Sequence, residues 1–251
     1  MAKKCAICGA EVNMLQSQKL VDGNYICRPT CKKLGMNILE YQYSDLAKVK
    51  AHNEQVKRGA EMWDYFFVPR MKSGSLKNFR KSIFVAEDLG LLALKRNRYK
   101  FLFWGKTEQF CVYRIADLYV CDVEVRSSSG KNKNSKTYHV NFYFRNVEGL
   151  TRFSIQFNRK LSYKIANYFD SLLGFETRNR WSRQADSIKG TFDMVKSAIS
   201  GDLNLDPATM HSDAAYEEFA KKSGSLREGG NRADWIKKSD AAMQEFSSFI
   251  R

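Results

Sequence analysis

Four cysteines near the N-terminus constrain this chain more than any other feature. They form two close pairs, Cys5-x2-Cys8 and Cys27-x3-Cys31, separated by 18 residues. In a reducing compartment such pairs hold metal ions more often than they form disulfides. Thiolate sulfurs surround zinc at about 2.3 Å in a tetrahedron. We therefore predict a structural zinc ion held by all four thiolates, which leaves no open position for catalysis at the metal.

The residues between and after the pairs predict a knuckle, a hairpin and a helix. Gly9 directly follows Cys8 and relieves the backbone where a knuckle turns. Asp22-Gly23 is a strong hairpin signal, and Pro29 fits the first turn of a helix that starts near the second pair. This layout is that of a treble-clef zinc finger.

Residues 1–36 also resemble a known family. The stretch CAICGAEV…KLVDGNYICRPTCKKLG is similar to the small N-terminal zinc-binding domain of uncharacterised proteins from Gram-positive bacteria and their phages. Members of that family more often close the second pair with an x2 spacing, whereas CRPTC has x3. The resemblance implies a zinc-binding module over residues 1–36 and brings no activity with it.

A connector helix is predicted in residues 37–70. Ser44 is a favourable N-cap, and Pro69 together with KSGS (72–75) should end the helix. A mostly apolar stripe at steps of three and four runs through Leu39, Gln42, Leu46, Val49, Asn53, Val56, Ala60, Trp63 and Phe67. The stripe fits a homo-oligomeric coiled coil over residues 39–67, with Asn53 setting the register or oligomeric state. It also fits a helix packed on its own domain, which the modest apolar content favours.

Residues 71–176 predict a β domain closed by one helix. From Ser82 the apolar pattern approaches a period of two. Seven runs rich in β-branched and aromatic residues are separated by turn signals: SIFVAED, LGLLALKR, YKFLFWG, FCVYRI, LYVCDVEVR, TYHVNFYFR and LTRFSIQF. The stretch NRKLSYKIANYFDSLLGF then places its apolar residues on one helical face. The predicted fold class is α+β.

This succession of strands and helix resembles bacterial pleckstrin-homology-like (PH-like) domains over about residues 78–175. VYRIADLYVCDVEV is similar to their Ile-x-x-Leu strand pattern, and LSYKIANYFDSLLG fits their closing helix. The resemblance implies an antiparallel β-barrel without shared catalytic residues, which binds lipid headgroups, peptides or proteins, or serves as a scaffold. Another small barrel or a β-sandwich is the competing interpretation.

Basic residues mark a candidate anion site in the β domain. In lipid-binding PH-like domains, basic residues between the first two strands hold phosphates, and LKRNRYK is a stretch of the same kind. Alternation along a strand would place Arg96, Arg98 and Lys100 on one face. The candidate anion- or partner-binding residues are Lys95, Arg96, Arg98, Lys100, Lys131 and Lys133. A solvated strand edge that blocks edge-to-edge pairing is the alternative.

Residues 177–251 predict a helical region. Its helices are expected around Trp181, after Asp206, and over residues 232–250. They could carry a partner or pack on the β domain.

No motif in the sequence points to an enzyme. The three histidines, His52, His139 and His211, lie in different segments, and HExxH, P-loop, GxSxG and GxGxxG motifs are absent from the sequence. Cys111 and Cys121 lie among β-branched and aromatic residues, which predicts small buried thiols. A cryptic hydrolase or nuclease, whose residues converge only in space, is the remaining enzymatic alternative.

Charge and composition complete the functional prediction. The net charge is +15, and residues 1–84 carry 15 Lys and Arg against 7 Asp and Glu. Such an excess favours a polyanionic partner. We predict a zinc-stabilised, non-enzymatic binding or adaptor protein of bacterial or phage origin. Its expected partner is a protein, such as a host or defence complex, or an anionic membrane surface.

The alternative function is nucleic-acid binding by the basic N-terminal two thirds. MAKKCAICG lacks the hydrophobic region of a signal peptide, and no apolar run approaches the ~18 residues of a membrane-spanning helix. We therefore expect a cytoplasmic protein, with peripheral membrane attachment as the alternative.

Overall fold

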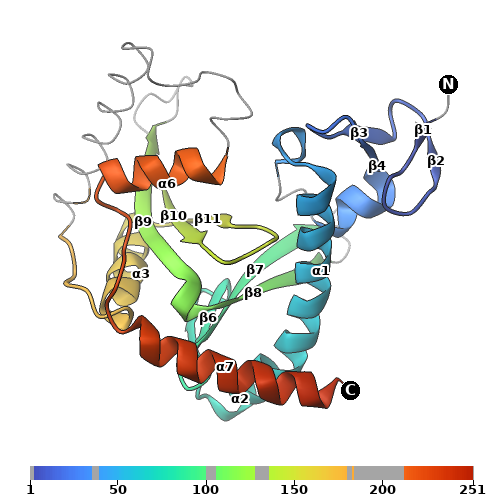
Figure 1. Ribbon diagram of the computed structural model, residues 1–251. Helices are drawn as coiled ribbons and strands as arrows, with labels where there is room; N and C mark the ends of the chain where they lie inside the picture. Colours follow the sequence, from blue (N-terminus) through green and yellow to red (C-terminus); the bar gives the residue numbers. More distant parts are fainter. Residues whose placement is uncertain are drawn as a thin grey trace. The chain divides into compact units, whose positions relative to one another are not determined.

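The computed structural model describes residues 3–35, 40–99, 106–127, 136–179, 183 and 212–250 (Figure 1). The chain divides into two compact units. Unit 1 comprises Met1–Ile115, Val147–Leu150 and Trp235–Arg251, and unit 2 comprises Ala116–Asn146 and Thr151–Asp234.

Unit 1 begins with the cysteine module, which is the name used here for residues 3–35. Two antiparallel strand pairs and one helical turn build it: β1 (Lys3–Lys4) with β2 (Glu11–Val12), β3 (Ser17–Lys19) with β4 (Tyr25–Cys27), and η1 (Arg28–Lys32). The predicted hairpin at Asp22-Gly23 joins β3 to β4, and Gly23 has a φ of 84° that favours glycine. Knuckle, hairpin and helical turn therefore occur in the predicted order.

A short turn, η2 (Tyr41–Tyr43), leads to helix α1 (Leu46–Met62). The N-cap is Asp45, whose Oδ1 accepts from the Lys48 N–H at 2.7 Å, and not the predicted Ser44. Ser44 donates its hydroxyl to the Glu40 carbonyl instead. The prediction failed because two adjacent residues can both cap a helix, and tertiary contacts select one of them.

The helical run continues past Pro69 and ends within KSGS, the second of the two predicted stop signals. A π-helical turn, η3 (Trp63–Phe67), follows α1, and α2 (Val68–Ser73) follows η3 with Pro69 in its first turn. The missing N–H of a proline is tolerated in a first turn. The Arg70 guanidinium also donates to the Phe66 carbonyl at 3.0 Å. The run ends at Gly74, which has a φ of 73°.

The apolar stripe of α1 and η3 packs inside unit 1. Val49, Asn53 and Val56 are buried on α1, and Trp63 and Phe67 are buried on η3. Gly59 brings α1 against strand β8 (Lys106–Arg114). This packing corresponds to the second interpretation of the stripe, a helix packed on its own domain.

A four-stranded antiparallel sheet forms the rest of unit 1 together with most of helix α7 (Arg232–Phe249). The strands are β5 (Lys77–Phe79), β6 (Ile83–Ala86), β7 (Leu91–Tyr99) and β8 (Lys106–Arg114), in the order β5-β6-β7-β8. Trp63 stacks on Phe110 of β8 at 3.8 Å between ring centroids and meets Phe84 edge-on at 4.7 Å. Phe246 of α7 is fully buried in the same cluster. Aromatic residues from helix and sheet therefore make the core of this unit.

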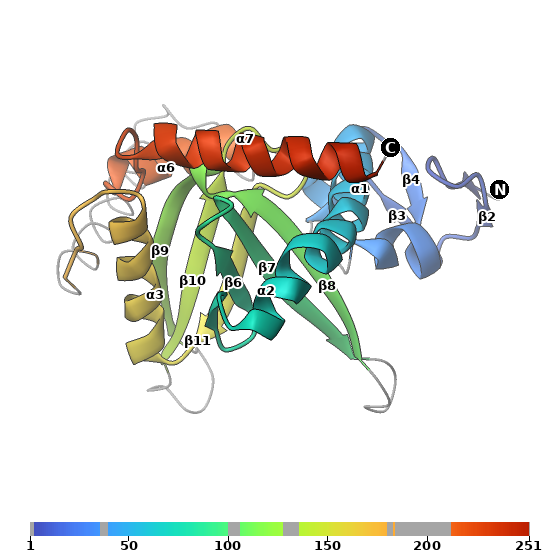
Figure 2. The ribbon, with the colours of Figure 1, turned by 90° about the horizontal axis from the view of Figure 1, so that it is seen from below.

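Unit 2 pairs a three-stranded antiparallel sheet with helix α3. After the turn η5 (Ile115–Asp117), the strands are β9 (Leu118–Ser127), β10 (Lys136–Phe144) and β11 (Arg152–Phe157), and the helices are α3 (Arg159–Leu172) and α6 (Asp213–Lys222). Figure 2 shows α3 lying along this sheet, where Phe169 meets Phe142 edge-on at 5.5 Å. Arg145 ties α6 to β10 by bonding both carboxylate oxygens of Glu217.

The predicted closed barrel is not shown. The seven strands β5 to β11 form two sheets of four and three strands, and no hydrogen-bonded strand pair joins those sheets within the described ranges. Alternation identifies strands but does not determine whether the end strands of a sheet meet. The predicted strand YKFLFWG lies largely outside the described residues, as do the helix around Trp181 and the cap at Asp206.

Helices α3 and α7 correspond to predicted helices. No helix among the described residues is long and apolar enough to cross a membrane.

Candidate metal centre

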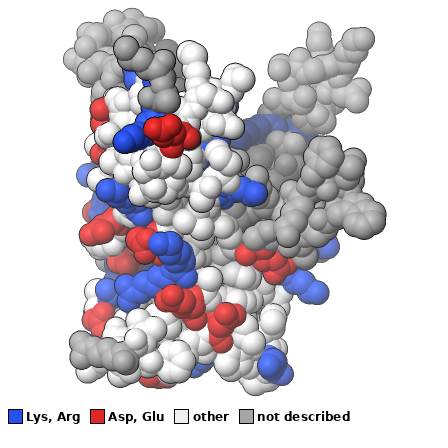
Figure 3. Space-filling view, turned by 90° about the vertical axis from the view of Figure 1, so that its right-hand side faces the viewer, with Lys and Arg blue, Asp and Glu red and all other residues white. Residues whose placement is uncertain are grey.

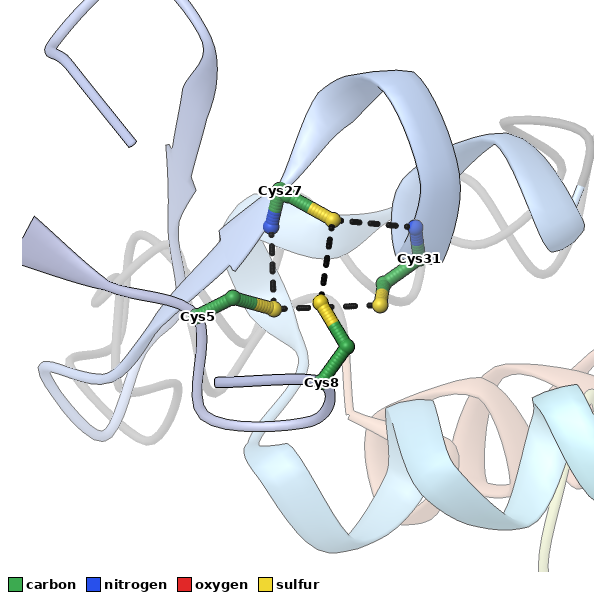
Figure 4. A group of neighbouring side chains, drawn as sticks. All are labelled: Cys5, Cys8, Cys27 and Cys31. Atoms are coloured by element: carbon green, nitrogen blue, oxygen red, sulfur yellow. Dashed lines mark hydrogen bonds between the residues drawn. The ribbon is translucent and has the colours of Figure 1, made fainter. Parts of the chain in front are cut away.

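The four predicted cysteines converge on one point. The sulfurs of Cys5, Cys8, Cys27 and Cys31 all lie within 4.8 Å of one another and point toward a common centre (Figure 4). The Sγ distances Cys5–Cys31 and Cys8–Cys27 are both 3.7 Å. Sulfurs at about 2.3 Å from a tetrahedral ion are separated by about 3.8 Å, so the cluster has the dimensions of a four-thiolate metal site. All four cysteines are free of disulfides.

The backbone of the module holds the sulfurs in place. In the first knuckle, the Gly9 N–H donates to the Cys5 carbonyl at 2.9 Å, and Gly9 adopts a φ of 73°. The Cys27 N–H donates to Cys5 Sγ at 3.3 Å, and the Cys31 N–H donates to Cys27 Sγ at 3.2 Å. Such N–H donors stabilise negative charge on sulfur. The x3 spacing of the second pair is accommodated by the π-helical turn η1, which places Cys31 beside Cys27.

The thiols differ in how readily they ionise. Burial opposes ionisation of Cys5, but N–H groups of Cys8, Ile7 and Cys27 outweigh it and lower the pKa of Cys5 to about 6. Burial, followed by the neighbouring thiols, raises the pKa of Cys31 well above its ordinary value. Four thiolates this close repel one another, so full ionisation requires a cation among them.

The module is anchored to the rest of unit 1 by contacts that the sequence did not indicate. Asp22 in the hairpin turn accepts from the Leu46 N–H at 2.9 Å, which joins the turn to the start of α1. The Tyr41 hydroxyl donates to the Lys32 carbonyl at 2.9 Å, and His52 Nε2 lies 3.3 Å from the Gly35 carbonyl. No periodicity or motif marks these contacts, because each joins a single side chain to a backbone atom.

Two amide side chains complete this anchoring. Asn53 Nδ2 donates to the Cys31 carbonyl at 3.4 Å, and Gln109 Nε2 of β8 donates to the Leu34 carbonyl at 2.7 Å. Asn53, the predicted register residue of a coiled coil, therefore contacts the backbone of one of the four clustered cysteines within the same chain.

The candidate basic residues are only partly placed by the structure. Lys95 Nζ forms an ion pair with Glu108 at 3.0 Å, and its side chain is 9% exposed. Arg96 is exposed on β7 opposite Gln109, and the backbone of Arg98 lies opposite Thr107. Both arginines belong to β7, where strand alternation predicts a shared face for them. Lys100, Lys131 and Lys133 lie outside the described residues.

Cys111 and Cys121 are buried, as predicted, at 2% and 4% exposure. Burial raises the pKa of Cys111 to about 12 and raises that of Cys121 well above its ordinary value. Both thiols are therefore protonated near neutral pH and are poor nucleophiles.

The four-cysteine site fits a small metal-binding domain, and a family comparison agrees with this class. Residues 3–52 match a domain of unknown function (DUF4428). Together with the four-cysteine cluster, this match fits a small zinc-binding domain. The matched segment covers the cysteine module, η2 and the first turns of α1. No curated protein and no solved structure matches the chain.

Proposed function

We propose that this chain is a zinc-stabilised, non-enzymatic binding protein, and that its cysteine module is a treble clef. The observation that carries the proposal is the closed four-sulfur cluster with 3.7 Å sulfur separations. Four thiolates occupy every position of a tetrahedral ion, so the metal would hold the module together without meeting a substrate. Because so small a module has little core of its own, metal binding would supply much of its folding free energy.

Zinc is the proposed metal because an all-sulfur tetrahedron suits zinc or iron, and zinc needs no redox partner. The test is metal analysis of the purified chain by mass spectrometry, together with its visible absorption spectrum. One zinc per chain and no visible band support the proposal. Iron with a coloured thiolate band, or no bound metal, contradicts it.

The β region supports a PH-like assignment without a shared active site. A four-strand meander, a three-strand meander and helix α3 follow one another in the order that the sequence resemblance implies. Glu124 of β9 lies opposite His139 of β10. Arg126 donates to both carboxylate oxygens of Glu124, and Asn141 donates to one of them. A carboxylate held in this way is poorly placed to act as a general base with the histidine.

A protein is the proposed partner. Lys and Arg side chains are interspersed with Asp and Glu on the face drawn in Figure 3, rather than gathered into a patch of one sign. Mixed charge fits the polar rim of a protein interface better than it fits a polyanion. Six cysteines free of disulfides support a reducing, cytoplasmic location for this partner. A bacterial or phage origin and a host or defence complex as partner stay part of the proposal.

Affinity purification of the tagged chain from its native host, with mass spectrometry, tests this function. We expect a protein that co-purifies in constant ratio with the wild type. A Cys8→Ser/Cys31→Ser variant, which should lose the metal, is the matched control for binding through the N-terminal unit. The absence of any enriched protein would contradict the proposed function.

Nucleic-acid binding is the second candidate, and the net charge of +15 favours it. Binding through phosphates would make the logarithm of the affinity fall steeply with the logarithm of salt concentration. Titration of labelled duplex DNA and single-stranded RNA at several salt concentrations measures that slope. Submicromolar binding with a steep slope would favour this candidate, whereas weaker binding without preference would eliminate it.

A further inference from the structure

A pocket of about 600 Å³ lies in unit 1 between the cysteine module, helix α1 and the first half of strand β8. Its lining includes Ile7, Pro29 and Leu34 from the module. Lys50 and Asn53 line it from α1, and Gln109 lines it from β8. The volume is within the range of ligand sites, and the walls combine apolar side chains with a few polar groups, as ligand sites do.

Two unpartnered acceptors distinguish this pocket from an ordinary surface groove. Within the described part of the chain, the amide oxygens Asn53 Oδ1 and Gln109 Oε1 are both buried without a hydrogen-bond partner, and Asn53 is 4% exposed. The orientation of each amide is determined by its NH₂ group, which donates to the Cys31 or Leu34 carbonyl. Each oxygen therefore needs a donor from elsewhere, since an unmade buried hydrogen bond is costly.

The charges around the pocket indicate which charged groups a ligand would carry. Lys33, Lys50 and Lys57 line it together with one acidic residue, Glu54, which pairs with Lys57. The lining thus has an excess of positive charge that attracts carboxylates or phosphates. Arg96, on the strand next to Gln109, adds a further cation near the β8 side.

We infer that this pocket binds an acidic peptide segment of a partner protein. An extended peptide offers main-chain N–H groups to Asn53 and Gln109, whose buried oxygens come within reach when the two side chains turn toward the ligand. It also places one apolar side chain among the apolar walls and carboxylates beside Lys33 and Lys50. The phosphodiester backbone of a nucleic acid and the acyl chains of a lipid carry no N–H donors, so only a base or an amino headgroup could reach the two amide oxygens, whereas nearly every residue of a peptide brings an N–H beside its side chain. This inference rests on the proposed protein-binding function and names the site and chemistry of the contact.

The test uses the full zinc-loaded chain and an array of labelled, capped heptapeptides. Each peptide has one central apolar residue flanked by Asp and Glu, and each is paired with a version carrying Asn and Gln instead. Fluorescence anisotropy gives the affinities. We expect some acidic peptides to bind at least tenfold more tightly than their amide counterparts.

Three variants connect that binding to the pocket. Lys50→Glu should weaken it by about tenfold or more, whereas Arg58→Glu, on the same helix but outside the lining, should change it by less than about twofold. Asn53→Leu removes the unpartnered oxygen and should also weaken binding. Zinc content and circular dichroism verify that each variant is folded. If Asn53→Leu does not fold, Lys50→Glu alone tests the inference.

Two results would overturn the inference. One is an array in which acidic peptides bind no better than their amide counterparts or bind Lys50→Glu equally well. The other is Lys50-dependent binding of oligothymidylate or phosphatidylserine vesicles in place of peptides. A native partner captured equally by wild type and Lys50→Glu would support the proposed function and exclude the pocket as the binding site. The absence of any partner would refute the function itself, while the array still reports on the pocket.

Discussion

At the scale of single residues, Gly59 shows how closely α1 approaches the sheet. A Cβ added to Gly59 would lie 2.1 Å from the backbone oxygen of Phe110 in β8. Backbone cannot move aside as a flexible side chain can, so the helix and strand would have to separate. The glycine is therefore required by packing, although glycine weakens a helix.

Gly59→Ala distinguishes the effect of packing from that of helix propensity, because the two change the stability in opposite directions. Helix propensity alone predicts stabilisation by about 1 kcal/mol, whereas overpacking predicts a loss of about 1–3 kcal/mol. We expect the loss, measured as a lower melting temperature. The exposed neighbour supplies the control, because Ala60→Gly should lose only about 1 kcal/mol of propensity. A higher melting temperature for Gly59→Ala would contradict the described packing.

His52 makes the stability of unit 1 depend on pH. It is fully buried, with Nδ1 3.3 Å from Gln55 Oε1 and Nε2 near the Gly35 carbonyl. Burial lowers the pKa of His52 below its ordinary value of 6.5. As pH falls through 6.5, the unfolded chain binds a proton that the folded chain does not. The free energy of unfolding should therefore decrease below about pH 6.5.

Urea denaturation at pH 7.5 and 5.5 measures this dependence. His52→Gln should show a smaller loss between the two pH values than the wild type. His139→Gln, at a partly exposed strand position, should keep the wild-type loss. Equal losses in all three proteins would show that His52 is not the group responsible.

At the scale of elements, the cysteine module should depend on its metal. Its strands have two or three residues each, so they bury little apolar surface by themselves. Chelation should therefore make residues 3–35 sensitive to protease, while the β9–β11 sheet of unit 2 stays protected. Limited proteolysis followed by mass spectrometry identifies the first cleavage sites.

Two cysteine variants serve as the matched pair for this prediction. Cys8→Ser removes one proposed ligand and should reproduce the effect of the chelator without any chelator present. Cys121→Ser changes a buried thiol outside the cluster and should leave the module protected. Unchanged protease resistance of residues 3–35 after chelation would refute the metal assignment.

The sequence predicted the four-cysteine cluster better than the elements around it. Spacing brings sulfurs together through local turns, so Cys5, Cys8, Cys27 and Cys31 could be grouped from the chain alone. The anchoring residues could not be found in this way, because Asp22 and Gln109 act on backbone atoms that are distant in sequence. Strand runs were recognisable by alternation, whereas closure of a barrel depends on edges that alternation does not report.

At the scale of the whole molecule, we can test whether the two compact units are stabilised independently of each other. Unit 2 contains a buried cluster in which Arg183 bonds Asp170 and Asp122, while Arg178 and Arg227 lie near Asp170. The side chains of Arg183 and Asp170 are 1% and 3% exposed. Removing one partner of a buried ion pair leaves its charge uncompensated.

Asp170→Ala should therefore destabilise unit 2 by about 3–5 kcal/mol. The metal content of the cysteine module should be unchanged, because the module belongs to unit 1. Hydrogen exchange with mass spectrometry reads the two units separately in one sample. Faster exchange confined to β9–β11 and α3 is the expected pattern. Equal acceleration in α1 and β8 would show that the two units unfold as one.

The π-helical turn at Trp63–Phe67 has a consequence for how this chain can change in length. A π-turn accommodates one residue more than an α-helical turn, and each residue of an α-helix advances about 100° around its axis. Loss of a single residue here would restore an unbroken α-helix. Because the extra residue of a π-turn is wound within the same turn of the helix, its loss would leave the cysteine module and the aromatic core in nearly their present orientation. A one-residue deletion at this turn should thus keep both the four-cysteine cluster and the burial of Trp63, which tryptophan fluorescence would report, whereas the same deletion within α1 would turn the module by about 100° and expose Trp63.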